Sequence, residues 1–119
     1  MDKSMALFLA TLLHSSTNAH FFHWATKSYA KHKALGGFYE RIIELTDELA
    51  EAYFGCYGQI TDFPATYHQP KEPLAYLQSL QRFVKEARAD LPTDSEIVQL
   101  IDNIAQEIDT TLYLLRFKS

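Results

Sequence analysis

The chain contains little of what disulfide-bonded, membrane-spanning or basic nucleic-acid-binding proteins require. Its single cysteine, Cys56, excludes an internal disulfide and is typical of a reducing compartment. No apolar run approaches the roughly 20 residues that a membrane-spanning helix needs. The formal net charge of -4 argues against nonspecific attraction to nucleic acid. We therefore expect a cytoplasmic protein whose partner is neither a membrane nor a nucleic acid.

Proline is also scarce, and three of the four prolines fall in one segment, from Cys56 to Pro73. This segment shows no apolar period, and at about 18 residues it is long for a connection between helices of a compact domain. A crossover of this length is what a helix bundle needs when its third helix runs parallel to its second.

Apolar periodicity predicts two helices on each side of this crossover: the first from about Asp2 or Ser4 to Lys27, and the others at about residues 30–54, 72–89 and 94–117. We expect Ser28 to break or cap the chain between the first two helices, and Gly55 to end the second. Thr93 or Asp94 is expected to cap the fourth helix. The pattern indicates an all-α fold, a ferritin-like four-helix bundle that forms a single domain over residues 1–119.

The stretch from His20 to Glu51 holds three of the five histidines and the only tryptophan. His20 and His23 are three residues apart and continue the apolar stripe of the first helix, so they share a face. Asp47 and Glu51 are four residues apart and share a face of the second helix, and His32 lies between the two pairs. Imidazoles and carboxylates delivered from adjacent helices suit Fe, Mn or Zn.

The order of these residues resembles that of the Dps proteins, ferritin-like bacterial proteins that oxidise iron and protect DNA. Their signature has a His-Trp pair, a downstream Leu-His and an Asp-x-x-x-Glu; here His23-Trp24 is followed by DELAE at residues 47–51. His32 precedes Asp47 by fifteen residues, the spacing of the second family histidine. The resemblance implies that His23 and His32 bind iron on one side of a two-fold interface. It also implies that Asp47 and Glu51 bind it from the partner subunit.

The wider pattern from Tyr29 to Gly55 is similar to that of short, uncharacterised bacteriophage proteins, a likeness that covers most of the chain and brings no established activity. If the chain is encoded by a phage, the cytoplasm in question is that of the host cell.

The chain departs from the Dps pattern in several places. The gap between His23 and His32 is shorter, and Gly36 stands where an additional family aspartate would fall. The small helix of the family does not fit easily into the crossover, and the lysine-rich tail linked to DNA binding is missing. These departures favour metal binding over iron storage or DNA protection, and a dimer over a twelve-subunit shell.

The same residues also have structural interpretations. His23 and His32 could pack at a helix–helix seam and be satisfied by hydrogen bonds, while Asp47 and Glu51 could form an exposed acidic face. For His20, three roles are open: an alternative ligand, a group that orients Glu51 from outside the ligand shell, or a core histidine.

The residues together favour a homodimer or higher homo-oligomer that binds iron, with Zn or Mn as alternatives, and that has ferroxidase or peroxide-detoxifying activity. The alternative is a non-catalytic helical-bundle protein of phage origin, which binds a host factor through the mixed acidic and apolar face of the second helix. A third hypothesis is a structural Zn site that ties two subunits together.

Overall fold

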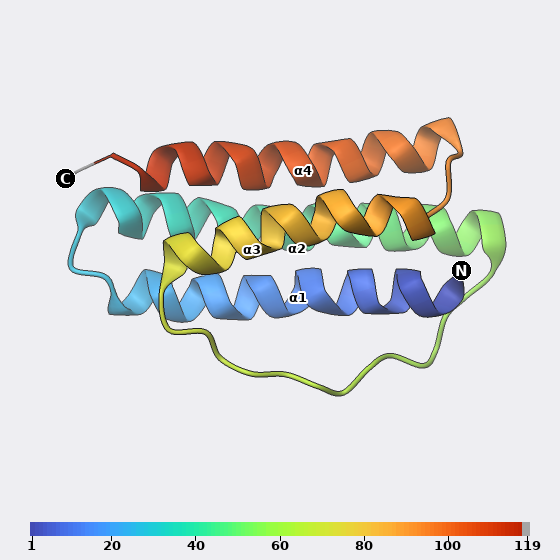
Figure 1. Cartoon of the computed structure of the whole chain (residues 1–119), viewed down its shortest axis with the longest axis horizontal. Coiled ribbons are helices and arrows are strands. Elements are labelled where there is room, and N and C mark those ends of the chain that lie inside the picture. Colours follow the sequence, from blue (N-terminus) through green and yellow to red (C-terminus); the bar gives the residue numbers. More distant parts are fainter. Residues whose placement is uncertain (118–119) are drawn as a thin grey trace.

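The computed structural model describes residues 1–117, which form four α-helices and no strand. The elements are α1 (Asp2–Ala25), α2 (Tyr29–Tyr57), α3 (Pro73–Ala87), a 3-10 turn (Arg88–Asp90) and α4 (Ser95–Leu115). The prediction of an all-α, four-helix fold is confirmed (Figure 1).

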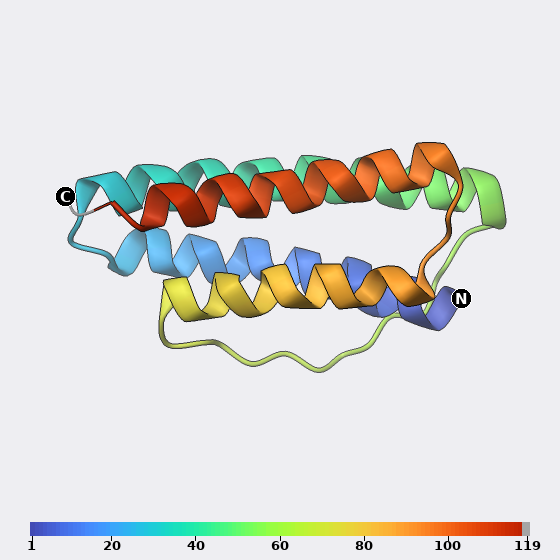
Figure 2. The same cartoon turned by 45° about the horizontal axis from the view of Figure 1, so that its top comes forward.

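The helices lie in two layers, one formed by α2 and α4 and the other by α1 and α3 (Figure 2). α1 and α2 are antiparallel and are joined by a short connection at residues 26–28. The segment from Gly58 to Glu72 returns along the length of the bundle, so α3 runs in the same direction as α2 (Figure 1). The long crossover expected from the sequence is therefore present.

The core is built from apolar side chains at helical spacing on all four helices. The contribution of α2 is Leu35, Phe38, Ile42, Leu45, Leu49 and Tyr53, and that of α4 includes Ile97, Ile101, Ile104 and Ile108. Leu13, which the sequence places in the apolar stripe of α1, instead lies on the outer side of the helix and is 45% exposed. The reason is that Leu13 sits at the edge of that stripe, where α1 faces outward.

Several helix ends differ from the prediction. The sequence predicts that α2 ends at Phe54 with Gly55 as its cap, but α2 continues through Gly55 and is capped by Gly58. Gly58 has a φ of 102°, which only glycine adopts without strain, whereas Gly55 is helical. α3 ends two residues before the predicted position, and the 3-10 turn follows it. The predicted cap at Ser28 is confirmed, because its side chain accepts a hydrogen bond from the backbone N–H of Lys31.

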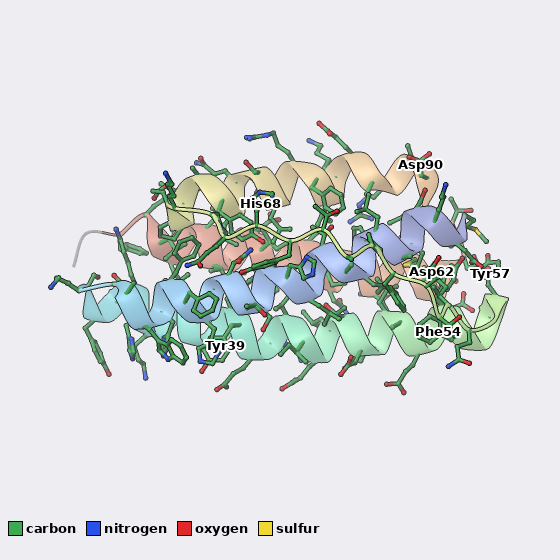
Figure 3. The ribbon with its side chains drawn as sticks, turned by 90° about the horizontal axis from the view of Figure 1, so that it is seen from below. Tyr39, Phe54, Tyr57, Asp62, His68 and Asp90 are labelled. Atoms are coloured by element: carbon green, nitrogen blue, oxygen red, sulfur yellow. The ribbon has the colours of Figure 1, made fainter. Side chains whose placement is uncertain are left out.

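Asp94 is the N-cap residue of α4, as predicted, but its carboxylate makes no hydrogen bond to the helix backbone. It accepts a hydrogen bond from the hydroxyl group of Tyr57 instead, and so joins the end of α2 to the start of α4. Figure 3 shows Tyr57 at this end of the bundle, close to the start of the crossover.

Within residues 1–117, none of the helices has both the length and the apolarity that crossing a membrane requires.

The start of α1 is joined to α2 by a buried tyrosine. The hydroxyl group of Tyr53 donates a hydrogen bond of 2.5 Å to a carboxylate oxygen of Asp2. Burial, followed by this bond to Asp2, raises the pKa of Tyr53 to about 12. The neutral phenol is therefore favoured by the folded state.

This linkage gives a prediction for alkaline pH. Since the Tyr53 hydroxyl has a raised pKa in the folded chain, its contribution to stability is fully present below pH 10 and is lost as the pH rises toward about 12. We expect the free energy of unfolding in urea to fall more steeply over this window for the parent than for Tyr53→Phe. Tyr113→Phe, which removes an exposed hydroxyl group, is the control and should keep the slope of the parent. Equal slopes for the parent and Tyr53→Phe would contradict the assignment.

Candidate metal centre

His23 and His32 form a reciprocal pair where α1 ends and α2 begins. The Nδ1 atom of His23 lies 2.6 Å from the backbone oxygen of His32, and Nδ1 of His32 lies 2.8 Å from the backbone oxygen of His23. The two rings stack, with centroids 3.7 Å apart and planes 18° from parallel. We call this arrangement the His23–His32 clasp, and it ties the two ends of the connection between α1 and α2 to each other.

The clasp determines which nitrogen of each neutral ring carries the proton. A carbonyl oxygen can only accept a hydrogen bond, so each Nδ1 must be the N–H donor. In the neutral ring, Nε2 then holds the free lone pair. A histidine that donates Nδ1–H to a backbone carbonyl and keeps Nε2 available is in the tautomer that metal ligation requires. The hydrogen-bonded seam expected from the structural interpretation of His23 and His32 is therefore present, and in this tautomer the Nε2 atom of each ring stays free.

Gly36 allows the ring of His23 to lie directly against α2. A Cβ atom at Gly36 would lie 3.0 Å from Cε1 and 3.1 Å from Nδ1 of His23, closer than such atoms normally approach. At Gly37, the same position is open, with nothing within 4 Å. Gly36 is also the position where the Dps resemblance expects an additional aspartate. His23 occupies the space that this side chain would need.

His20 is surrounded by aromatic rings. Its ring stacks on Tyr39 with centroids 3.9 Å apart and planes 9° from parallel, and it lies 4.5 Å from the ring of Trp24. The ring of His23 is 6.2 Å away. Among the three roles that the sequence left open for His20, packing is the one for which the structure provides contacts. Figure 3 shows Tyr39 at the edge of the molecule where α1 and α2 lie side by side.

The sequence did not point to Tyr39, or to Ser16, which is hydrogen-bonded to the backbone of Tyr39. The hydroxyl group of Ser16 donates a 2.7 Å hydrogen bond to the backbone oxygen of Tyr39. This bond fixes the axial position of α1 relative to α2. Ser16 is buried within the apolar stripe of α1, and that position is the one signal in the sequence that could have identified it. This contact places Gly36, one turn before Tyr39, beside His23.

The other two histidines take no part in the clasp. The ring of His14 packs edge-on against Tyr67 of the crossover, with centroids 5.0 Å apart. His68 is exposed on the crossover, well away from Tyr39 (Figure 3).

Asp47 and Glu51 lie exposed on α2, and neither has a hydrogen-bond or ion-pair partner among residues 1–117. The 11 residues from Gly36 to Asp47 correspond to about 16 Å along the helix. One chain therefore does not bring the clasp and the carboxylates together. In the described part of the chain, no three His, Cys, Asp or Glu side chains are close enough to hold a metal ion. If these residues bind a metal, His23 and His32 would supply one half of the ligands and Asp47 and Glu51 the other, and we call the two pairs the candidate half-sites.

The two neighbouring glycines provide a matched pair of variants. Replacing a helix-interior glycine by alanine at an open position should stabilise the fold by about 0.5–1 kcal/mol. We expect this gain for Gly37→Ala, whereas Gly36→Ala should gain less or lose stability because the new methyl group displaces His23. Urea unfolding measures the stability, and NMR of the imidazole Nδ1–H groups reports on the clasp. Equal stabilisation by both variants, with the clasp signals unchanged, would show that Gly36 is not needed for the clasp.

Comparison with curated proteins and with solved structures gave no significant match. The sequence profile of a family of unknown function (DUF5856) matches residues 23–115. The matched region contains both half-sites, begins at His23 and leaves His20 outside. Because it covers most of the chain, the protein belongs to the DUF5856 family.

Proposed function

We propose that this protein is a homodimeric metal-binding protein with a ferritin-like helix topology. His23 and His32 of one chain and Asp47 and Glu51 of the second chain would bind a divalent ion between them. Iron is the metal that the Dps resemblance favours, and Zn and Mn are accepted by the same ligand types. The observation that supports the proposal is the His23–His32 clasp, in which each Nδ1 faces a backbone oxygen and each Nε2 is left free, beside a helix that carries the exposed pair Asp47 and Glu51.

The positions of the half-sites on α2 suit a two-fold axis. Gly36, against which His23 packs, lies seven residues before Ile43, and Asp47 and Glu51 lie four and eight residues after it. In an isologous dimer with its axis near Ile43, the two α2 helices would be antiparallel. Each histidine half-site would then face the carboxylate half-site of the other chain.

The face around this axis carries apolar side chains that the monomer leaves exposed. Ile43 is 42% exposed, Leu13 is 45% exposed and Trp24 is 67% exposed. One face of α1 carries Leu13, His20 and Trp24, which are seven and four residues apart. This face lies beside α2, because the ring of His20 stacks on that of Tyr39. Exposed apolar side chains on two adjacent helices favour a protein–protein interface.

The distribution of charge along α2 favours antiparallel pairing. No acidic residue occurs between Lys3 and Tyr39, whereas Lys27 lies in the connection before α2 and Lys31 and Lys33 lie in the first two turns of α2. The part of α2 that follows Tyr39 carries five carboxylates, at Glu40, Glu44, Asp47, Glu48 and Glu51. Antiparallel pairing would bring the basic end of each chain to the acidic half of its partner, whereas parallel pairing would oppose like charges.

Each bound Fe(II) ion would supply one electron, so the two-electron reduction of peroxide, or of dioxygen to peroxide, would take two such ions. The chain's own residues would bind and orient each ion. The clasp presents two imidazoles whose Nε2 lone pairs are free, and α2 presents two carboxylates without internal partners. If the chain is instead a monomer without metal, the same apolar and acidic face would be the contact surface of the alternative, an adaptor that binds a host factor.

The proposal predicts which carboxylates matter for metal binding. We expect Asp47→Ala and Glu51→Ala each to weaken the binding of Fe(II), Zn or Mn by about tenfold or more. Glu48→Ala is the matched control, since Glu48 lies between them in the sequence but about 100° from Asp47 and about 60° from Glu51 around the helix. Equilibrium dialysis with elemental analysis measures binding at neutral pH, without oxygen for Fe(II), and light scattering measures the mass.

Two results would count against the proposal. A parent protein that is monomeric and takes up none of the three metals would favour the adaptor. If Asp47→Ala binds metal as well as Glu48→Ala does, α2 does not supply the carboxylate half-site.

A further inference from the structure

α3 and α4 run antiparallel on the side of the bundle opposite α1 and α2 (Figure 2). Two side-chain contacts join them. The side-chain amide of Gln81 donates a 2.8 Å hydrogen bond to a carboxylate oxygen of Asp109. The guanidinium group of Arg88 lies 2.9 Å from a carboxylate oxygen of Asp102. Since the contact residues are seven positions apart on each helix, the two contacts lie about 10 Å apart along the helices.

Between these two contacts, α3 carries cations that α4 does not pair. Lys85 lies three residues before Arg88 and faces Ala105 in the antiparallel register, and Ala105 has no group that could pair with an ammonium. Arg82, one turn earlier, donates to the hydroxyl group of Ser79 at 3.2 Å. Within residues 1–117, neither Lys85 nor Arg82 therefore has a carboxylate partner.

A hollow of about 530 Å³ lies at this place between α3 and α4. Its apolar lining consists of Val84, Ala105 and Ile108. Sites for small molecules commonly measure about 300–1,000 Å³ and combine an apolar lining with a few polar groups. The hollow therefore has the size and the lining of a small-molecule site.

The charge at the hollow is positive, although the whole chain has a net charge of -4. The charged side chains that line it are Arg82, Lys85, Arg88 and Asp109. Asp109 already accepts the hydrogen bond from Gln81, about 6 Å along the helix from the level of Lys85. An anion beside Lys85 would therefore meet unpaired cations first.

We propose that this hollow binds a small organic phosphate. The phosphate group lies against Lys85 and Arg82, and the apolar body of the ligand lies over Ala105. Side chains three residues apart on a helix are neighbours, so the ammonium and guanidinium groups can reach one anion together. A phosphate ester carries a charge near -2 and three acceptor oxygens, which match a guanidinium fork and an ammonium better than one carboxylate does.

The site goes beyond the proposed function. It lies on the side of the bundle opposite the α1–α2 face, so the proposed dimer would leave it open. Binding there needs neither the metal nor the second chain, and the two proposals can fail separately.

The test uses phenyl phosphate, which joins a phosphate group to an apolar ring, and compares it with phenol and with inorganic phosphate. Backbone amide NMR of ¹⁵N-labelled protein follows each titration in about 0.15 M salt, which screens weak surface attraction. We expect shifts confined to residues 81–88 and 102–109. Phenyl phosphate should bind about tenfold or more tightly than either of the other two probes, because it uses both the cations and the apolar lining.

Two variants with matched controls locate the site. Arg82→Ala/Lys85→Ala should weaken phenyl phosphate binding about tenfold or more, whereas Lys33→Ala, which removes an exposed cation from α2, should keep the affinity of the parent. Ala105→Glu places a carboxylate opposite Lys85 and should weaken binding as well. Gln106→Glu makes the same change of charge at the next, exposed position and is its control. Unchanged amide signals of α1 and α2 show that each variant is folded.

Three results would overturn the proposal. Equal binding of phenyl phosphate by the parent and by Arg82→Ala/Lys85→Ala would show that these cations hold no ligand. Inorganic phosphate that binds as tightly as phenyl phosphate would show attraction of an ion to surface charge alone. Tighter binding of hexaglutamate than of phenyl phosphate would assign the hollow to an acidic segment of a protein partner instead.

Discussion

The imidazole of His23 packs against α2 at Gly36, where even a Cβ atom would lie 3.0 Å from the ring. That contact allows each histidine to donate its Nδ1–H to the backbone of the other across the short connection between α1 and α2. The reciprocal bonds fix the tautomer of both rings and leave both Nε2 atoms available. The hydrogen bond from Ser16 to the backbone of Tyr39 fixes the axial position of α1 relative to α2, and so keeps His23 beside Gly36. The candidate metal centre depends on this local arrangement.

The rigidity of α2 also limits which of the candidate ligands can meet within one chain. A continuous helix keeps Asp47 and Glu51 about 16 Å or more from the level of Gly36, so flexing of side chains cannot complete the ligand set within one chain. The same helix displays an exposed isoleucine, Ile43, between the two half-sites and a reversal of charge along its length. Candidate half-sites, an apolar midpoint and opposite charges at the two ends are features that the proposed isologous interface would use.

The sequence was sufficient for those features that depend on periodicity and on local capping chemistry. The four helices, the long crossover and the cap at Ser28 follow from such signals. The end of α2 did not, because Gly55 and Gly58 carry the same local signal and the structure places the positive φ at Gly58 alone. The spacing of Asp47 and Glu51 was enough to place them together on α2. A hydrogen-bonded seam of His23 and His32 was one of the interpretations that the sequence allowed, but its partners could not be predicted, because the acceptors are backbone oxygens. The stack of His20 on Tyr39 could not be predicted either, because it depends on the axial position of one helix relative to the other.

The most direct test of a site shared between two chains is to combine two variants that each lack one half-site. One chain carries His23→Ala and His32→Ala, the other Asp47→Ala and Glu51→Ala, and metal binding is measured for each alone and after co-expression. Each variant alone should bind no ion at the site. With random pairing, half of the dimers are mixed and each mixed dimer has one complete site, so about a quarter of the parent's sites should return. Absence of any recovery, with mixed dimers shown to form, would contradict a metal site assembled from both chains.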